Sequence, residues 1–220
     1  MSDGKTVEAT FCFVDIAGFT ALTDTHGGQA AADLVDDFTA LVRKSIEGRG
    51  QLQELIGDCA YLVFPDPVAA YDSLLALYEA IVDRENFPVI RTGLHHGSAL
   101  FRNGRYFGTT VNLAARVAAE ALGGHIFCTR SIADVLADAR PDTAGIRYHG
   151  SVSLKNLPEP VELFEIVPSS CVRAYAIDPV CKMQVDTHSA AGKLQFNGRT
   201  HWFCSIECVE RFARQPAAYA

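Results

Sequence analysis

Residues 11–20 constrain the fold of this chain more than any other stretch. They begin with an apolar run that is typical of a buried strand, and Asp15 stands at the end of that run. Gly18 follows and allows a turn whose backbone can approach a ligand, and Thr20 can cap a helix. A strand that delivers one carboxylate to a glycine turn and a helix N-terminus suits a phosphate-bound divalent cation.

Residues 55–64 contain a second carboxylate in a related setting. Gly57 and Asp58 separate two apolar runs, a pattern typical of a hairpin turn from which Asp58 projects. Carboxylates at the ends of adjacent strands can share a pair of metal ions. Either aspartate alone is equally typical of an ordinary turn, so the prediction of a metal site depends on the pair.

Composition sets the broad class of protein. A chain of 220 residues that is 49% hydrophobic can bury the core of one main domain plus a small appendage. A net charge of −7 without a basic run argues against nucleic acid as a partner. There is no apolar run of membrane-spanning length and no basic-then-apolar N-terminus, so we expect a cytoplasmic protein with no membrane partner.

Hydrophobic periodicity predicts strands alternating with helices. The order predicts an α+β sandwich with helices on one side of a sheet. A break in the first helix is expected around Gly27 and Gly28. We expect strands near residues 7–14, 51–56, 59–64, 89–101, 126–128, 146–152 and 161–167, and helices near 20–47, 68–84, 109–122 and 131–137.

The helix expected near residues 109–122, which follows a turn predicted at Asn103 and Gly104, carries a polar pair. Asn112 and Arg116 are four residues apart, so on a helix they share one face. An amide and a guanidinium aimed at one point suit a triphosphate whose charge grows during a reaction. The alternative is a polar stripe on an exposed helix. Lys155 lies on a loop before the last of these strands, a position typical of a solvated turn.

Together these segments resemble the catalytic domain of class III nucleotidyl cyclases. The resemblance implies a ferredoxin-like α+β fold, in a head-to-tail homodimer with active sites at its interface. It implies conversion of a purine nucleoside triphosphate, ATP or GTP, into the 3′,5′-cyclic nucleotide and pyrophosphate. The matching motifs lie, in order, at residues 13–20, 56–58, 107–116 and 154–155.

The resemblance also implies residue roles. The positions of Asp15 and Asp58, with the backbone carbonyl of Ile16, bind two Mg²⁺ or Mn²⁺ ions. Asn112 and Arg116 come from the other subunit, where they orient the ribose and stabilise the transition state. The turn next to the triphosphate corresponds to Ala17, Gly18, Phe19 and Thr20. Lys155 resembles the phosphate-contacting lysine of the family.

The base-selecting positions correspond to Glu54 and Arg105 and depart from the usual adenylyl cyclase pattern. Glu54 can accept hydrogen bonds from N1–H and N2–H₂ of guanine, and Arg105 can donate to O6 and N7. These side chains therefore favour GTP, since a mismatched base leaves buried groups unpaired. Bacterial-looking members of the family are mostly adenylyl cyclases, so the choice between ATP and GTP stays open. The alternative for Arg105 is that it points into solvent.

The C-terminal part resembles a YHS domain, a small module related to cysteine-rich metal-binding folds. We assign residues 1–168 to the cyclase domain, 169–175 to a linker and 176–220 to the YHS domain. Four of the seven cysteines fall within the last fifty residues, which supports a separate module there.

Three cysteines of this module form a candidate metal site. Cys204 ends a strand and Cys208 lies one helical turn later, so both thiolates can point at Cys181. Three thiolates suit Zn²⁺ or Cu(I), with His201, Cys171 or water as the fourth ligand. The alternative is a trio of reduced cysteines that pack together.

Two other functions compete with catalysis. The first is a catalytically weak pseudo-cyclase, a nucleotide-binding module whose base pocket has drifted at Glu54 and Arg105. The second is a metal sensor or metallochaperone in which the cyclase fold only dimerises.

Overall fold

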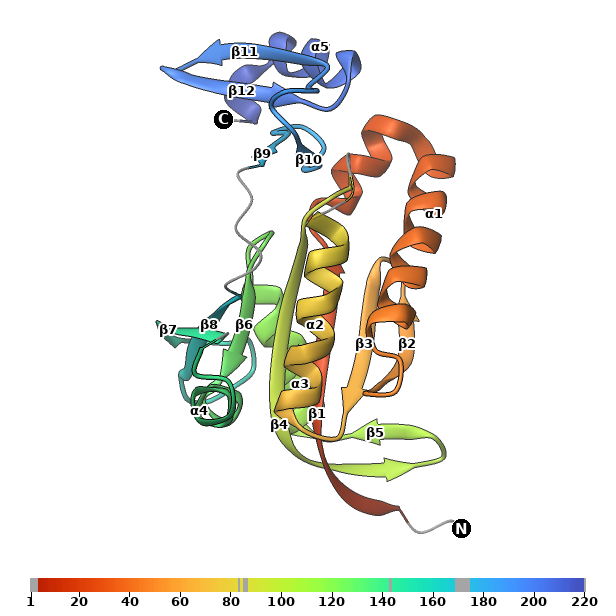
Figure 1. The fold of residues 1–220 in the computed structure, drawn as a ribbon, viewed down its shortest axis with the longest axis vertical. Coiled ribbons are helices and arrows are strands. Elements are labelled where there is room, and N and C mark those ends of the chain that lie inside the picture. Colours follow the sequence, from red (N-terminus) through yellow and green to blue (C-terminus); the bar gives the residue numbers. More distant parts are fainter. Residues whose placement is uncertain (1–3, 83, 85–86, 143, 169–174, 220) are drawn as a thin grey trace.

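The computed structural model describes residues 4–82, 84, 87–142, 144–168 and 175–219, which form a large layered region and a small C-terminal module (Figure 1). The main sheet has eight strands, in the order β2-β3-β1-β4-β6-β8-β7 with β5 paired to β4. Its strand pairs are antiparallel except β4 and β6, which are parallel. The strands are β1 (Lys5–Ile16), β2 (Gln51–Ile56), β3 (Cys59–Phe64), β4 (Ile90–Arg102), β5 (Arg105–Phe107), β6 (Ile126–Thr129), β7 (Ala144–Val152) and β8 (Val161–Pro168).

Helices cover both faces of this sheet. Cys12, Val14 and Ile16 of β1 share a core with three of the helices, whereas Phe11 packs with Ala114 of the fourth, α3. Successive residues of a strand point to opposite faces, so α3 lies opposite the other three. The expectation of helices on one side is therefore wrong, while the α+β class is confirmed. The helices are α1 (Phe19–Ser45), α2 (Pro67–Val82), α3 (Thr109–Glu120) and α4 (Arg130–Ala139).

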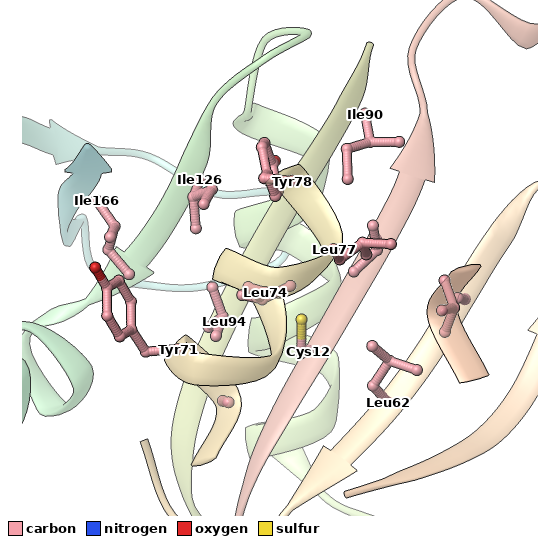
Figure 2. Packing of buried hydrophobic residues seen from close by; sticks show 14 of the residues in the cluster. Cys12, Leu62, Tyr71, Leu74, Leu77, Tyr78, Ile90, Leu94, Ile126 and Ile166 are labelled. Atoms are coloured by element: carbon pink, nitrogen blue, oxygen red, sulfur yellow. The ribbon is translucent and has the colours of Figure 1, made fainter. Parts of the chain in front are cut away.

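The helix α2 shows how the larger core forms. Asp66 precedes it and accepts a hydrogen bond from the Ala69 N–H at 2.8 Å, and Pro67 is its first residue. Its apolar residues recur every three to four positions, so one stripe faces the sheet. Figure 2 shows Tyr71, Leu74, Leu77 and Tyr78 of α2 packed with Cys12 of β1, Leu62 of β3, Leu94 of β4 and Ile126 of β6.

A single glycine sets how closely α3 approaches the sheet. A Cβ atom on Gly93 of β4 would lie 2.0 Å from the backbone nitrogen of Ala118. A side chain at position 93 would force the two elements apart, so glycine there and the alanine-rich face of α3 allow the close approach of the backbones. Thr110 adds a hydrogen bond from its hydroxyl to the Ser98 carbonyl at 2.5 Å. This close packing fixes the position of the polar residues that α3 carries.

The helix α1 is broken near its start. Gly27 has φ 84° and ψ 167°, which is not helical, so the helix consists of two segments that meet there. The break expected around Gly27 and Gly28 is therefore confirmed. The first segment runs towards the C-terminal module in Figure 1. No helix in the described part of the chain is long and apolar enough to cross a membrane.

The C-terminal module has its own small core, formed by Val180, Cys181, Phe203, Cys208 and Phe212. It docks on the larger region through a backbone hydrogen bond from Gln184 to the Phe87 carbonyl, at 3.0 Å. Apart from Tyr175, the predicted linker lies outside the described residues. The elements of the C-terminal module are β9 (Ala176–Ile177), β10 (Gln184–Val185), β11 (Gly192–Phe196), β12 (Arg199–Phe203), α5 (Ile206–Arg214) and a 3₁₀ turn (Pro216–Ala218).

Candidate functional site

Asp15 lies at the end of β1, on the sheet face that α3 covers. The strand register places it beside Cys59 of β3 and Arg91 of β4. Nε and Nη2 of Arg91 lie 2.6 Å and 2.5 Å from the same oxygen, Oδ2 of Asp15. The Asp15 side chain is mostly buried, with 16% of its surface exposed, so its position is well defined.

Asp58 meets Asp15 from the turn between β2 and β3. Gly57 adopts φ 63° in that turn, a conformation glycine takes without strain, and Asp58 follows it. Burial raises the pKa of Asp58 to about 6, helped by the negative charge of the nearby Asp15. The two carboxylates predicted from the sequence are thus brought together. The same burial and charges raise the pKa of Cys59 to about 12, so that thiol stays protonated.

The backbone after β1 turns sharply into α1. The Ala17 N–H donates to the Val89 carbonyl at 2.9 Å, and Gly18 takes the left-handed conformation, φ 76° and ψ 22°. Gly18 is the N-cap residue and no side chain caps the helix there, so Thr20, expected as a cap, instead lies inside α1 behind Phe19. The first N–H groups of the helix lack a side-chain acceptor, an arrangement that suits an anion.

Asn112, Arg116 and Lys155 gather around one open cavity of about 300 Å³. Asn112 and Arg116 come from one face of α3, and Lys155 follows the buried Leu154, which packs with Val117. The structure therefore brings these three predicted residues together. The described residues that line this cavity do not include Asp15 or Asp58, the two predicted metal-binding aspartates.

The two base-selecting candidates lie on neighbouring elements, Glu54 on β2 and Arg105 on the β4–β5 hairpin. A β-bulge between Leu52 and Glu54 pairs Glu54 with Tyr61, which turns Glu54 towards the face that carries Asp15. Arg105 is exposed at the tip of the β4–β5 hairpin. It is Gln53 that contacts this hairpin, donating from Nε2 to the Gly104 carbonyl at 2.7 Å.

The three cysteines of the C-terminal module form a tight cluster. The Sγ atoms of Cys181 and Cys204 are 3.3 Å apart, and those of Cys204 and Cys208 are 3.8 Å apart. The neighbouring thiols of Cys181 and Cys204 lower the pKa of Cys208. His201, one of the three candidates for the fourth ligand, packs against Phe212, with ring centroids 4.8 Å apart and ring planes tilted by 37°.

Comparison with known proteins decides the family. The family model of the adenylate and guanylate cyclase catalytic domain matches residues 2–166, and the YHS domain model matches residues 176–220. The chain belongs to the adenylate and guanylate cyclase family. It carries a YHS domain at its C-terminal end, as the sequence motifs predicted.

Relatives and solved structures agree with this assignment. The chain is 32% identical over 161 residues to the pH-sensitive adenylate cyclase MT1302 of Mycobacterium tuberculosis, covering 72% of this chain and 40% of that protein. It is 31% identical over 129 residues to an adenylate cyclase of Streptomyces coelicolor, covering 58% of this chain and 34% of that protein. The chain therefore spans about two fifths or less of these relatives.

The fold of the cyclase domain matches solved cyclase structures. The adenylyl cyclase CyaB from P. aeruginosa superposes with a TM-score of 0.67 at 22% identity, over 79% of this chain and all of that chain. The guanylyl cyclase Cya2 gives 0.63 at 18% identity, over 76% and 95%. These likenesses confirm the cyclase fold expected from the motifs.

The structure adds three residues that the sequence motifs missed. Arg91 contacts Asp15 from β4, and nothing in its local pattern distinguishes it from any arginine in a strand. Tyr61 stacks on Phe13 with centroids 4.6 Å apart, and within the described chain its hydroxyl is buried without a hydrogen-bond partner. His26 of α1 lies against the cysteines of the YHS domain, with Nε2 3.9 Å from Cys204 Sγ. Cys171, the other expected ligand, is outside the described residues.

Proposed function

We propose that this chain is a nucleotidyl cyclase that converts ATP or GTP into the 3′,5′-cyclic nucleotide and pyrophosphate at a homodimer interface. The observation that carries this proposal is the meeting of two carboxylates, Asp15 and Asp58, beside the glycine turn at Gly18. The relatives named adenylate cyclases, which share this domain, support it.

The donor set at this position fits a divalent metal. Two carboxylates close to each other, near the Ile16 carbonyl at the strand end, are the hard oxygen ligands that Mg²⁺ and Mn²⁺ prefer. The hydrogen bond and the ion-pair contact from Arg91 both go to a single oxygen of Asp15, so the guanidinium does not hold the other oxygen. When bound, two such ions neutralise the triphosphate and lower the pKa of the ribose 3′-hydroxyl.

The remaining roles, in binding the substrate and stabilising charge, would fall to backbone N–H groups and to three side chains. Free N–H groups after Gly18 would bind the phosphates, and Asn112 would hold the ribose. The ribose 3′-oxygen attacks the α-phosphorus in line, and the bond to the bridging oxygen breaks as pyrophosphate leaves. Arg116 would stabilise the charge that grows on the phosphoryl oxygens, and Lys155 would contact the leaving group.

A two-fold dimer would join the two half-sites. Asn112, Arg116 and Lys155 line a cavity whose described lining contains neither aspartate, and a second copy would bring the two sets together. Large apolar side chains stand exposed near the aspartates and on the β4–β5 hairpin: Ile56 at 54% and Phe107 at 49%. Such exposed apolar groups support a protein interface there.

The base remains a choice between two supported proposals. Glu54 faces the site because of the bulge in β2 and favours guanine, whereas the curated relatives named above are adenylate cyclases. The test is purified protein with Mn²⁺ and either ATP or GTP, with the cyclic product quantified. Product from either base supports the enzyme, provided that Asp15→Asn abolishes it. No product from a folded, dimeric protein that still binds nucleotide would favour the pseudo-cyclase.

A further inference from the structure

Four metal-ligating side chains from both domains meet at one point. Nε2 of His26 and the Sγ atoms of Cys181, Cys204 and Cys208 all lie within 4.8 Å of one another. Tetrahedral coordination with metal–sulfur bonds of about 2.3 Å requires ligand atoms about 3.8 Å apart. The contacts made by Cys204 are 3.3 Å and 3.8 Å to the other sulfurs and 3.9 Å to the histidine.

The break in α1 places His26 at this point. His26 is the last residue before Gly27, whose non-helical backbone ends the first segment of the helix. At that end, where helix carbonyls lack helical donors, Arg211 of the YHS domain donates from Nη2 to the Asp24 carbonyl at 2.8 Å. The YHS domain thus holds the segment that presents the imidazole.

A buried carboxylate fixes the loops that carry the thiols. Asp178 is fully buried, and its Oδ1 accepts from the Val180 and Cys181 N–H groups at 2.8 Å and 3.4 Å. Its Oδ2 accepts from the Cys204 N–H at 2.9 Å. Cys208 is placed in turn by Ser205, whose side chain caps α5 by accepting from the Cys208 N–H. These supports hold the ligand set in place before any ion binds.

The same loop touches the candidate phosphate turn of the cyclase domain. A Cβ atom on Gly18 would lie 2.5 Å from Cγ of Lys182, and the Cys181 carbonyl is 3.9 Å from that position. Lys182 itself has φ 64°, so the residue after the first thiol is held in a tight turn. One metal-ligating loop therefore rests on Gly18, the N-cap residue of α1, mainly through the side chain of Lys182.

We propose that His26 completes, with Cys181, Cys204 and Cys208, a tetrahedral Zn²⁺ site that joins the YHS domain to the cyclase domain. Its ligand set is that of a structural zinc site, three thiolates and one imidazole, with no open position for chemistry. Because one loop of this site rests on Gly18, occupancy by zinc orders the turn that precedes α1. That regulatory part rests on the proposed cyclase function, whereas the metal site does not.

The test of the ligand set is Co²⁺ substitution of the full chain under reducing conditions. We expect one ion with tetrahedral ligand-field bands and thiolate charge-transfer bands, which the oxygen donors of Asp15 and Asp58 cannot produce. His26→Ala should keep the charge-transfer bands, change the ligand-field bands and weaken zinc binding more than about tenfold. His26→Cys should restore the affinity and strengthen the charge transfer, which also shows that variants at this position fold.

Two matched controls decide the assignment. His188 is 93% exposed on the same domain, so His188→Ala should leave both the spectrum and the affinity unchanged. His201→Ala removes the histidine that packs against Phe212 and should also leave the spectrum unchanged. A cobalt spectrum that is the same in His26→Ala and the parent, or one that changes with His201→Ala instead, would overturn the proposal.

Amide hydrogen exchange tests the link between domains without an activity assay. Zinc should slow exchange of the N–H groups in residues 18–26 of the parent, and not in His26→Ala. Zinc bound by the thiols with no change in exchange there would refute the link between domains. Because neither readout uses nucleotide, failure of the cyclase assay would leave both results interpretable.

Discussion

Arg91 donates a hydrogen bond from Nε to Oδ2 of Asp15 at 2.6 Å, and its Nη2 forms an ion pair with the same oxygen at 2.5 Å, across the register of β4 and β1. The guanidinium offsets one of the two negative charges that meet at the strand end. A cation at the same carboxylates would compete with it for Asp15. The pair therefore links the stability of the metal-free protein to its affinity for metal.

The first prediction concerns Arg91→Gln. Without the guanidinium two carboxylates face each other uncompensated, so the metal-free protein should lose about 1 kcal/mol of stability, because the pair is partly exposed. Mn²⁺ should then raise the melting temperature more in the variant than in the parent. Thermal unfolding with and without Mn²⁺ measures both effects, and an unchanged Mn²⁺ shift would show that Arg91 and the ion do not compete.

The second prediction concerns Asp58→Asn. The pKa of Asp58 is raised to about 6 in the folded state, so its ionised form destabilises the fold above that pH. This destabilisation disappears as the pH falls from about 6 towards the lower pKa that Asp58 has in the unfolded chain. Removing the charge should therefore stabilise the metal-free protein at pH 7.5, by about 1 kcal/mol after allowance for solvent screening.

The check on Asp58→Asn is denaturant unfolding at two pH values. The gain should be smaller at pH 5 than at pH 7.5, since the parent aspartate is then largely protonated. The variant should also lose the stabilisation that Mn²⁺ confers on the parent. A loss of stability at pH 7.5 would contradict the repulsion between Asp58 and Asp15.

How much the sequence predicted depends on how local each signal is. The alternation of apolar residues, the Gly57 turn and the stretch around Gly18 act over a few residues, and the elements they predict are present. The pairing of the two aspartates was predicted correctly because the hydrophobic pattern identifies their strands. Asp15 lies at the end of one strand, and Asp58 lies in the turn between two others. The YHS cysteines were grouped correctly because Cys204 and Cys208 are one helical turn apart.

The features that the sequence did not predict depend on tertiary contacts. The side of the sheet that α3 covers is set by the contact of Gly93 with Ala118, which no periodicity reveals. His26 lies in a helix 178 residues before Cys204, and only the fold brings the two together. His201, which is much nearer in sequence, packs against Phe212 instead, and the four-residue cluster in the described chain contains His26.

The third prediction uses Gly93→Ala. The added methyl group would lie 2.0 Å from the backbone nitrogen of Ala118, and backbone cannot rotate away. We expect a loss of about 1–3 kcal/mol and a displaced α3 that lowers any activity depending on Asn112 and Arg116. Gly28→Ala is the matched control, because nothing lies within 4 Å of its Cβ position and it sits in a helix. Equal effects of the two substitutions would contradict the close packing of α3.

The fourth prediction tests whether the half-sites come from different subunits. Asp15→Asn and Arg116→Ala should each be inactive as homodimers, since each removes one half of both sites. In a mixed dimer one site carries both substitutions and the other carries neither. Random mixing of the two variants should therefore restore roughly a quarter of the parent activity per chain, as expected for two-fold dimers that exchange subunits. Product formation during titration of one variant into the other measures this recovery of activity.

The control is the double variant Asp15→Asn with Arg116→Ala. Mixed with the Arg116→Ala protein, it should restore no activity. No recovery from dimers shown to have exchanged would place both half-sites within one subunit, whereas activity from Arg116→Ala alone would show that Arg116 is not part of the site.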